Sequence, residues 1–253
     1  FALSSFDGCT PIAHPAIEAS TCTSAELVLA TDAVPVGYPG VTLQNPETAA
    51  CASTQAVNLR VVPPPTLLQV EPSLVCTAQG ARDVVVSGAG LLTVDGVLPA
   101  TTLDGTALTV RSADGCEPLE TQGNTVTNCG AVTVEVPVEQ TAAPRNPTLT
   151  VENPQPAGCS SATATDLLLV PPPTLTDVQP PALCENGGSQ VLRLTGTTLL
   201  VIDGLAPEVR VDGTLLDPGA VTPSGCTPLV APRRLVELCT TLDVVVDPAM
   251  VEG

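Results

Sequence analysis

The sequence contains no lysine and no tryptophan, and its single histidine is His14. All eight basic residues are therefore arginines, which makes Lys–Asn isopeptide cross-links chemically impossible in this chain. His14 stands alone before a proline, whereas a catalytic triad needs a positioned base and a group that orients it. We predict that the chain is not an enzyme, that it has no catalytic residue and that it binds no organic cofactor.

Aromatic residues make up only 1% of the chain: Phe1, Phe6 and Tyr38. Sites that recognise glycans or proteins are commonly rich in aromatic side chains, so this scarcity favours a structural role over recognition. Hydrophobic content is nevertheless 43%, so the core must consist of Val, Leu, Ile and Ala. Thin aliphatic cores suit small domains that carry additional staples.

Positive charge is also scarce, because the formal net charge is −18 and the pI is near 4.1. This balance argues against nucleic acid and anionic membranes as partners, since phosphate binding needs Lys and Arg. No apolar run approaches the length of a membrane span, so we expect no membrane insertion. Phe1 leads directly into Ala2, Leu3 and Ser4 without a signal peptide, so we expect a mature or internal fragment.

The chain has ten cysteines but no C-x-x-C pair. Zinc sites use closely paired Cys and His ligands, and that spacing is missing here. Disulfides formed in an oxidising compartment explain the cysteines better. We therefore predict an extracellular or cell-surface protein.

A repeat is the strongest signal in the sequence. Pro63–Leu67 recurs as Pro171–Leu175, an offset of 108 residues, and the same offset relates Cys76 to Cys184. It divides the chain into a first segment (1–62), which is the C-terminal part of a repeat, a complete second segment (63–170) and a third segment (171–253), which is the N-terminal part of another. We expect further repeats in the parent protein.

A second landmark, Gly-Cys-x-Pro, occurs once in each segment, and a further cysteine follows thirteen positions after the first. A disulfide closing so short a loop stabilises the folded chain by about 3 kcal/mol in the chain-entropy model. The predicted disulfides are Cys9–Cys22, Cys116–Cys129 and Cys226–Cys239.

Each segment has the pattern of an all-β fold. Val132–Pro137 and Leu242–Val246 are short β-branched runs, and Val191–Thr195 alternates apolar and polar residues as half-buried strands do. Gly, Pro, Asn and Asp bound these runs at short intervals, which is typical of a β-sandwich. Residues 42–60 are expected to form a hairpin with Asn45 and Cys51 in its turn.

The order of these motifs resembles IPT/TIG domains, which are immunoglobulin-like β-sandwiches of bacterial surface proteins and receptors. The resemblance rests on Pro173–Pro180, the Gly187–Gly188 turn, Val191–Gly196 and the later Val151–Pro154 hairpin motif. It implies tandem immunoglobulin-like domains along essentially the whole chain. The repeat is longer than is usual in that family, with an insertion around 91–100, and it adds four cysteines.

The partners of Cys51, Cys76, Cys159 and Cys184 stay open. A bridge between Cys76 and Cys159 within one repeat is the simple reading, but in an immunoglobulin-like strand order these turns lie at opposite ends of the domain. A disulfide needs Cα atoms within roughly 7 Å. The alternative joins the first turn of one domain to the last hairpin of its neighbour, along the chain or in another subunit.

Paired acidic turns recur as Asp95 with Asp104 and as Asp203 with Asp212. Their carboxylates are weak candidates for Ca²⁺ ligands, because calcium favours carboxylate and carbonyl oxygens. Asp-Gly pairs are, however, ordinary tight-turn chemistry, and we prefer that interpretation.

Triple prolines join the segments, and proline runs act as semi-rigid spacers. Repeat arrays of this kind set length and spacing. We therefore predict a structural component of an extracellular bacterial filament, stalk or surface array that self-associates, for instance through edge strands. The alternatives are an adhesin that binds a glycan or protein, and a spacer for a domain outside this sequence.

Overall fold

The computed structural model of the chain describes residues 2–13, 17–29, 34–47, 49–78, 80–137, 143–161, 167–183, 188–231 and 233–247. The fold is all-β, and the helical element in the described residues is one 3-10 turn, η1, at Pro218–Ala220. The chain divides into two compact units: Phe1–Pro63 with Leu119–Thr125, and Pro64–Pro118 with Val126–Gly253. The described residues form no helix that is long and apolar enough to span a membrane.

The described residues of the first unit form three antiparallel strand pairs. These pairs are β1 (Ala2–Asp7) with β4 (Ser24–Val28), β2 (Thr10–Ile12) with β3 (Ala19–Thr21), and β5 (Gly40–Val41) with β6 (Val57–Asn58). The β5–β6 pair and the bridge between Gln44 and Ala52 form the hairpin expected over residues 42–60.

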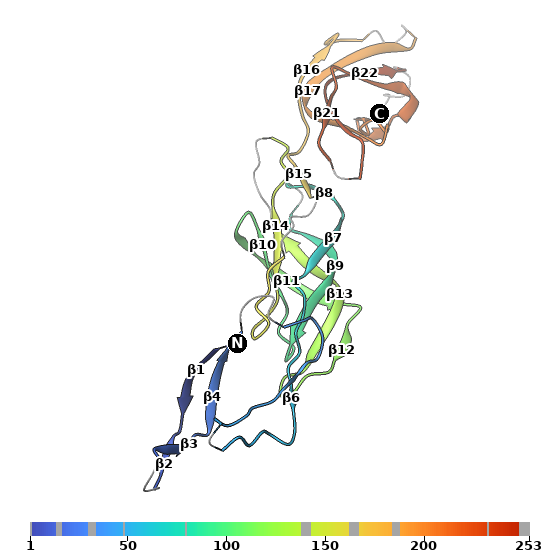
Figure 1. Ribbon diagram of the computed structural model, residues 1–253. Helices are drawn as coiled ribbons and strands as arrows, with labels where there is room; N and C mark the ends of the chain where they lie inside the picture. The colour runs from blue at the N-terminus through green and yellow to red at the C-terminus, as the bar shows by residue number, and fades with distance from the viewer. Residues whose placement is uncertain are drawn as a thin grey trace. The chain divides into compact units, whose positions relative to one another are not determined.

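The second unit begins with a large sheet of strand order β14-β10-β11-β13-β9-β7, in which β12 also pairs with β13 (Figure 1). A separate parallel pair joins β8 (Leu74–Cys76) and β15 (Leu168–Val170). The strands of the sheet are β7 (Thr66–Glu71), β9 (Arg82–Val94), β10 (Ala100–Leu103), β11 (Thr106–Asp114), β12 (Glu117–Leu119), β13 (Val126–Val136) and β14 (Leu149–Glu152).

The third segment repeats this order. Its sheet runs β16-β17-β22-β20 with β21 paired to β22, which matches β7-β9-β13-β11 with β12 paired to β13. A short pair, β18–β19, takes the place of the β10–β11 pair. The strands are β16 (Thr174–Gln179), β17 (Gln190–Ile202), β18 (Arg210–Val211), β19 (Thr214–Leu215), β20 (Val221–Ser224), β21 (Thr227–Leu229) and β22 (Val236–Val246).

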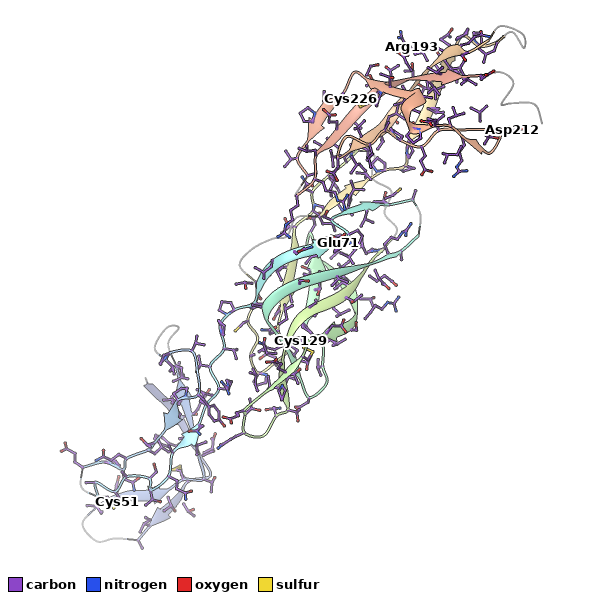
Figure 2. All side chains as sticks on the ribbon, turned by 90° about the vertical axis from the view of Figure 1, so that its right-hand side faces the viewer. Cys51, Glu71, Cys129, Arg193, Asp212 and Cys226 are labelled. Atoms are coloured by element: carbon purple, nitrogen blue, oxygen red, sulfur yellow. A yellow bond between two sulfur atoms is a disulfide. The ribbon has the colours of Figure 1, made fainter. Side chains whose placement is uncertain are left out.

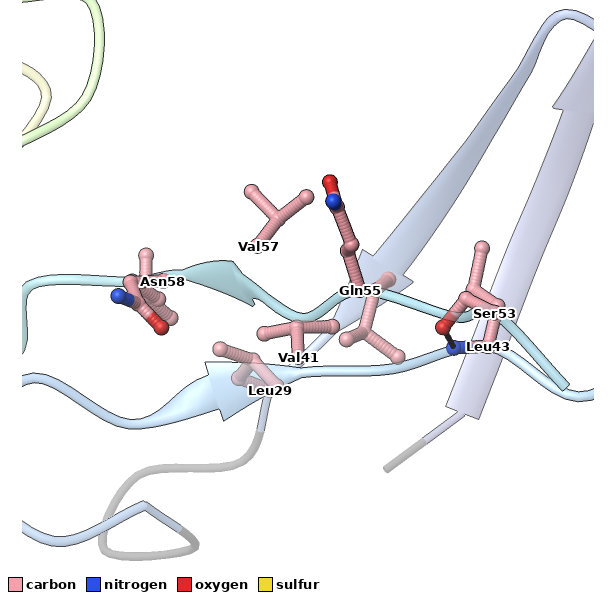
Figure 3. Close-up of a pocket in the computed structure, with 9 residues that line it drawn as sticks. Leu29, Val41, Leu43, Ser53, Gln55, Val57 and Asn58 are labelled. Atoms are coloured by element: carbon pink, nitrogen blue, oxygen red, sulfur yellow. Dashed lines mark hydrogen bonds between the residues drawn. The ribbon is translucent and has the colours of Figure 1, made fainter.

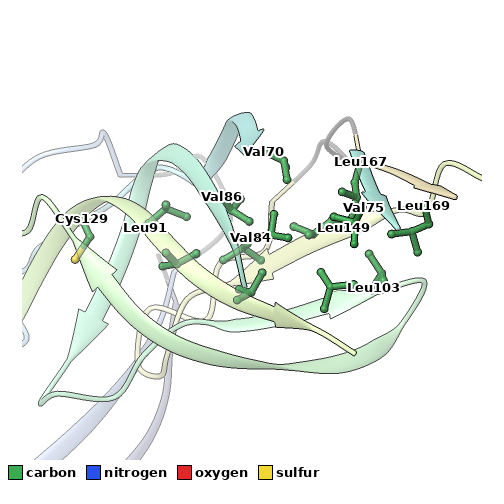
Figure 4. Close-up of a cluster of buried hydrophobic side chains, with 14 residues drawn as sticks. Val70, Val75, Val84, Val86, Leu91, Leu103, Cys129, Leu149, Leu167 and Leu169 are labelled. Atoms are coloured by element: carbon green, nitrogen blue, oxygen red, sulfur yellow. The ribbon is translucent and has the colours of Figure 1, made fainter. Parts of the chain in front are cut away.

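The core of the second segment is aliphatic, as the composition requires (Figure 4). Alternate valines of β9 and β13 point inward and are fully buried, among them Val84, Val86, Val132 and Val134. β14 and the return strand β15 add buried leucines to the same cluster. Period-two burial is the strand pattern that β-branched runs favour.

The glycines of two equivalent pairs, Ser87-Gly88 and Thr195-Gly196, are required for steric reasons. A Cβ built on Gly88 would lie 2.4 Å from the carbonyl oxygen of Thr66, and one built on Gly196 would lie 2.2 Å from that of Thr174. The edge strand bulges at both places, and the register shifts between Leu67 and Gln69 in β7. Glycine therefore lets the edge strand approach the central strand closely.

The region predicted as an insertion, 91–100, is largely an extension of the central strands. Leu91–Val94 belong to β9 and pair with Val126–Cys129 of β13. Asp95 and Gly96 then make the turn with positive φ, at 50° and 79°. Residues 91–94 therefore lengthen the pairing of the two central strands, β9 and β13.

Candidate functional site

The second and third segments meet in a buried aliphatic cluster, which we call the junction cluster. Its most buried members are Leu168 and Val170 of β15, which are 2% and 3% exposed, and Val236 of β22, which is 2% exposed. Around them pack Leu74, Cys76, Leu200, Ile202, Leu229 and Ala231. Because fully burying one such side chain stabilises by about 1.5–3 kcal/mol, this contact holds the two segments together.

Two hydrogen bonds cross the same junction. The Asn146 side-chain amide donates to the carbonyl of Val230 at 2.8 Å, and the Arg233 guanidinium donates to the carbonyl of Leu68 at 2.6 Å. Each bond satisfies a backbone carbonyl and fixes direction, which burial alone does not do. The segments are therefore joined by packing and by oriented polar contacts.

The loop that follows the short strand β12 makes a similar contact within the first unit. Arg60 donates from Nε to the carbonyl of Glu120 at 2.9 Å, and its guanidinium lies 4.8 Å from the centre of the Tyr38 ring. Glu120 follows β12 as Val230 follows β21. The same loop thus accepts a side-chain hydrogen bond in both places, and a cation–π contact orients the donor in the first.

The described residues form three disulfides, each of which closes a short loop (Figure 2). They join Cys9 to Cys22, Cys116 to Cys129 and Cys226 to Cys239, each across 13 residues. Cys129 and Cys239 are buried at 2% and 0% exposure, so these staples also fill the core.

Cys51, Cys76 and Cys159 carry free thiols. Cys51 is exposed, whereas Cys76 and Cys159 are half-buried. Cys51 and Cys159 occupy the same place in two equivalent hairpins: the amides of Asn45 and Asn153 donate to their carbonyls, both at 2.9 Å. Cys184 and His14 lie outside the described residues.

The four aspartates considered as calcium ligands all sit in tight turns with positive φ, between 48° and 53°. Asp104 accepts from the amide of Thr148 at 2.7 Å and pairs with Arg145. These two contacts lower the pKa of the Asp104 carboxyl below its ordinary value, and the Thr148 hydrogen bond is the larger cause. The carboxylate therefore ties its turn to the backbone at Thr148, which lies just before β14.

Asp203 is held in the same way. Its carboxylate accepts from the amide of Leu235 at 3.0 Å and from Arg234 at 3.2 Å. Across the described ranges, no group of three or more His, Cys, Asp or Glu side chains gathers as a metal site would require. The positions of Asp95, Asp104, Asp203 and Asp212 fit turn chemistry, and calcium binding stays a hypothesis.

A hollow of 440 Å³ opens on the first unit and is lined mainly by aliphatic side chains (Figure 3). Its residues correspond to core residues of the second segment, 108 positions later: Val41 to Leu149, Leu43 to Val151 and Leu59 to Leu167. All three counterparts are 0% exposed, whereas Leu43 is 57% and Leu59 is 37% exposed. The hollow is therefore the core face of the first segment, and its polar lining residues are Ser53, Gln55 and Asn58.

Several residues of the junction were not identified from the sequence. The junction cluster, Asn146 and Arg233 give no local signal, because their roles depend on the next segment. Asn153 belongs to the Val151–Pro154 motif, but nothing local in the sequence indicates that its side chain is 2% exposed and hydrogen-bonded to β9.

No protein-family model matches the chain, and no curated protein sequence is significantly similar to it.

Proposed function

We propose that the chain is a non-catalytic structural component of an extracellular bacterial filament, stalk or surface array built of stiff tandem immunoglobulin-like domains of the IPT/TIG type. The recurrence of one strand order in the second and third segments supports the tandem-domain part of this proposal. The three disulfides support an oxidising, extracytoplasmic location.

The observation that carries the proposal is the junction cluster. A flexible linker between domains would be polar and solvated, whereas here the chain runs from buried Val170 through Pro171–Pro173 directly into β16. Proline fixes φ, and the cluster and two hydrogen bonds act on both sides of the run. Domains joined in this way keep a constant spacing, which a rod or stalk requires.

Exposed edge strands supply a route to self-association. β16 ends the sheet of the third segment, and its residues are all exposed, with Leu175 at 58% and Val178 at 39%. An unpaired strand edge with apolar side chains is a template for pairing with another chain. Lateral assembly of copies would cover this edge.

The test places an aspartate at one of two adjacent positions, Leu229 or Val230, and compares the two variants by small-angle X-ray scattering. Leu229 packs into the junction cluster, whereas Val230 is 83% exposed. We expect Leu229→Asp to broaden the pair-distance distribution in small-angle X-ray scattering, because a buried charge opens the cluster. Val230→Asp leaves the carbonyl of Val230 and the cluster in place, so its distribution should equal that of the unaltered chain.

Both variants are checked by circular dichroism and by the presence of the Cys226–Cys239 disulfide, so that a loss of fold is recognised. Equal distributions for both variants and the unaltered chain would remove the junction as the source of stiffness. Electron microscopy of native material then tests the assembly: regular filaments support the proposal, and dispersed single rods contradict self-association.

A further inference from the structure

We propose that successive domains are covalently clasped by a disulfide between the turn cysteine of one domain, at the position of Cys76, and the hairpin cysteine of the following domain, at the position of Cys159. Such a clasp gives partners to the free thiols at the positions of Cys76 and Cys159, whether or not the domains form a filament.

Cys76 lies at one end of the second segment. It pairs in register with Val170, the last residue of β15, from which the chain leaves for the third segment. Figure 4 shows its neighbour Val75 beside Leu169, at one end of the aliphatic core. Cys76 itself is half-buried in the junction cluster.

Cys159 lies at the opposite end. Its carbonyl accepts from the amide of Asn153, whose side chain in turn accepts from the amide of Leu92 at 2.9 Å. Leu92 follows Leu91, which pairs with Cys129, and Figure 4 shows these two residues at the other end of the core. The hairpin is thereby anchored far from β8.

The distance excludes a bridge within one domain. Arg145 bridges Leu169 near the first end, and Glu152 bridges Ser160 near the second. Seven residues separate Arg145 from Glu152, and the last four form β14, so the two ends of the core lie on the order of 20 Å apart at about 3.3 Å per residue. A disulfide needs Cα atoms within roughly 7 Å, so Cys76 and Cys159 of one domain cannot meet.

The following domain does place its hairpin position beside Cys76. The hairpin of the second segment is anchored on Leu92, and the residue 108 positions later is Leu200. Leu200 packs in the junction cluster with Cys76. A hairpin anchored on Leu200 would therefore bring its cysteine to the end of the domain where Cys76 lies.

The pairing rule, in which the turn cysteine of one domain bonds to the hairpin cysteine of the next, also accounts for the free thiols of this chain. The counterpart of Cys76 in the third segment is Cys184, and the counterpart of Cys159 in the first segment is Cys51. Residues 1–253 therefore contain no turn cysteine followed by the hairpin cysteine of the next segment. Cys51, Cys76 and Cys159 are free as the rule requires.

The proposed disulfide forms by exchange with another disulfide, which acts as the oxidant. The two thiols lose two protons and two electrons as the Sγ–Sγ bond forms. A small-molecule or protein disulfide of the oxidising compartment accepts both electrons and both protons and is released as two thiols.

The test adds the missing hairpin to the full chain. A copy of residues 144–170 is appended after Gly253, so that the third segment gains the hairpin at the position that it has in the second segment. The extended chain is refolded with oxidised glutathione and mapped by mass spectrometry without reduction. We expect a peptide pair in which Cys76 is linked to the added hairpin cysteine, with the loss of two hydrogens. Cys76→Ser and a serine in the added hairpin are the matched controls, and each should abolish the pair.

A link from the added cysteine to Cys184 would overturn the inference, because it would show an intra-domain bridge. So would a Cys76 that stays fully alkylatable in an extended chain whose Cys226–Cys239 disulfide has formed. The unextended chain gives a second readout that does not depend on folding of the extension. Oxidation should produce no Cys76–Cys159 link within one molecule, and its appearance would refute the geometry. Scattering stiffness and filament formation are separate readouts, so the proposed function can fail or succeed independently.

Discussion

Replacing Asn153 by alanine should destabilise the second segment far more than the same change at Asn45. Asn153 is 2% exposed; its Oδ1 accepts from the amide of Leu92 at 2.9 Å, and its Nδ2 donates to the carbonyl of Gly90 at 2.8 Å. Alanine removes both partners and leaves a buried amide and a half-buried carbonyl unsatisfied. At about 1–3 kcal/mol for the buried amide and about 1 kcal/mol, the low end of that range, for the half-buried carbonyl, the loss is about 2–4 kcal/mol.

Amide hydrogen exchange at Leu92 measures this loss directly, without assuming that the whole chain unfolds in one step. Since each 1.4 kcal/mol is a factor of ten, exchange should accelerate roughly 30- to 1,000-fold. Asn45 holds the same place in the first hairpin but is exposed, so Asn45→Ala is the matched control and should leave Leu92 unchanged. An Asn153→Ala variant whose Leu92 exchanges as slowly as in the control would refute the argument that this side chain anchors the hairpin.

Three further results are expected. Gly88→Ala should lower the free energy of unfolding by about 1–3 kcal/mol, because its Cβ would lie 2.4 Å from the Thr66 carbonyl oxygen. In the control Gly130→Ala, the nearest atom lies 3.9 Å from the new Cβ, so the loss should be much smaller. Urea titration of both variants compares the two losses. The lowered pKa of Asp104 stabilises the fold above its unfolded pKa, near 3.9, and this contribution is lost as pH falls through the folded pKa. Asp104→Asn, which tolerates the positive φ, should therefore flatten the acid limb of a melting-temperature profile; an unchanged limb would contradict the role given to the Thr148 hydrogen bond. Calorimetry with Ca²⁺ against EDTA should show neither heat nor a shift in melting temperature, and a saturable heat would restore the calcium hypothesis.

The all-β class and many strand positions were predictable from the sequence, because β-branched runs and turn residues act locally. Val132–Pro137 and Leu242–Val246 fall almost entirely within β13 and β22. The hairpin around Asn45 was also predictable, since an Asn-Pro turn needs few distant contacts. The strand extension at 91–94 was not, because its partner at 126–129 lies more than thirty residues away.

The junction could not be predicted, for a physical reason. Leu229 and Val230 are adjacent apolar residues with no difference in local pattern, yet one packs in the junction cluster and the other is exposed. Which of the two side chains is buried depends on the direction in which the third segment leaves the second at Val170. The sequence leaves the partners of Cys76 and Cys159 open for the same reason, because the distance between the two ends of a domain cannot be inferred from residue spacing alone.

Residual dipolar couplings of the isotopically labelled chain test the central claim, that the second and third segments form one stiff body. Couplings are measured for amides of β9 and β13 in the second segment and of β17 and β22 in the third, in one alignment medium. We predict that a single alignment tensor fits both sets, because the junction cluster and its two hydrogen bonds fix the segments. Two tensors of different magnitude would show independent motion and would contradict the account.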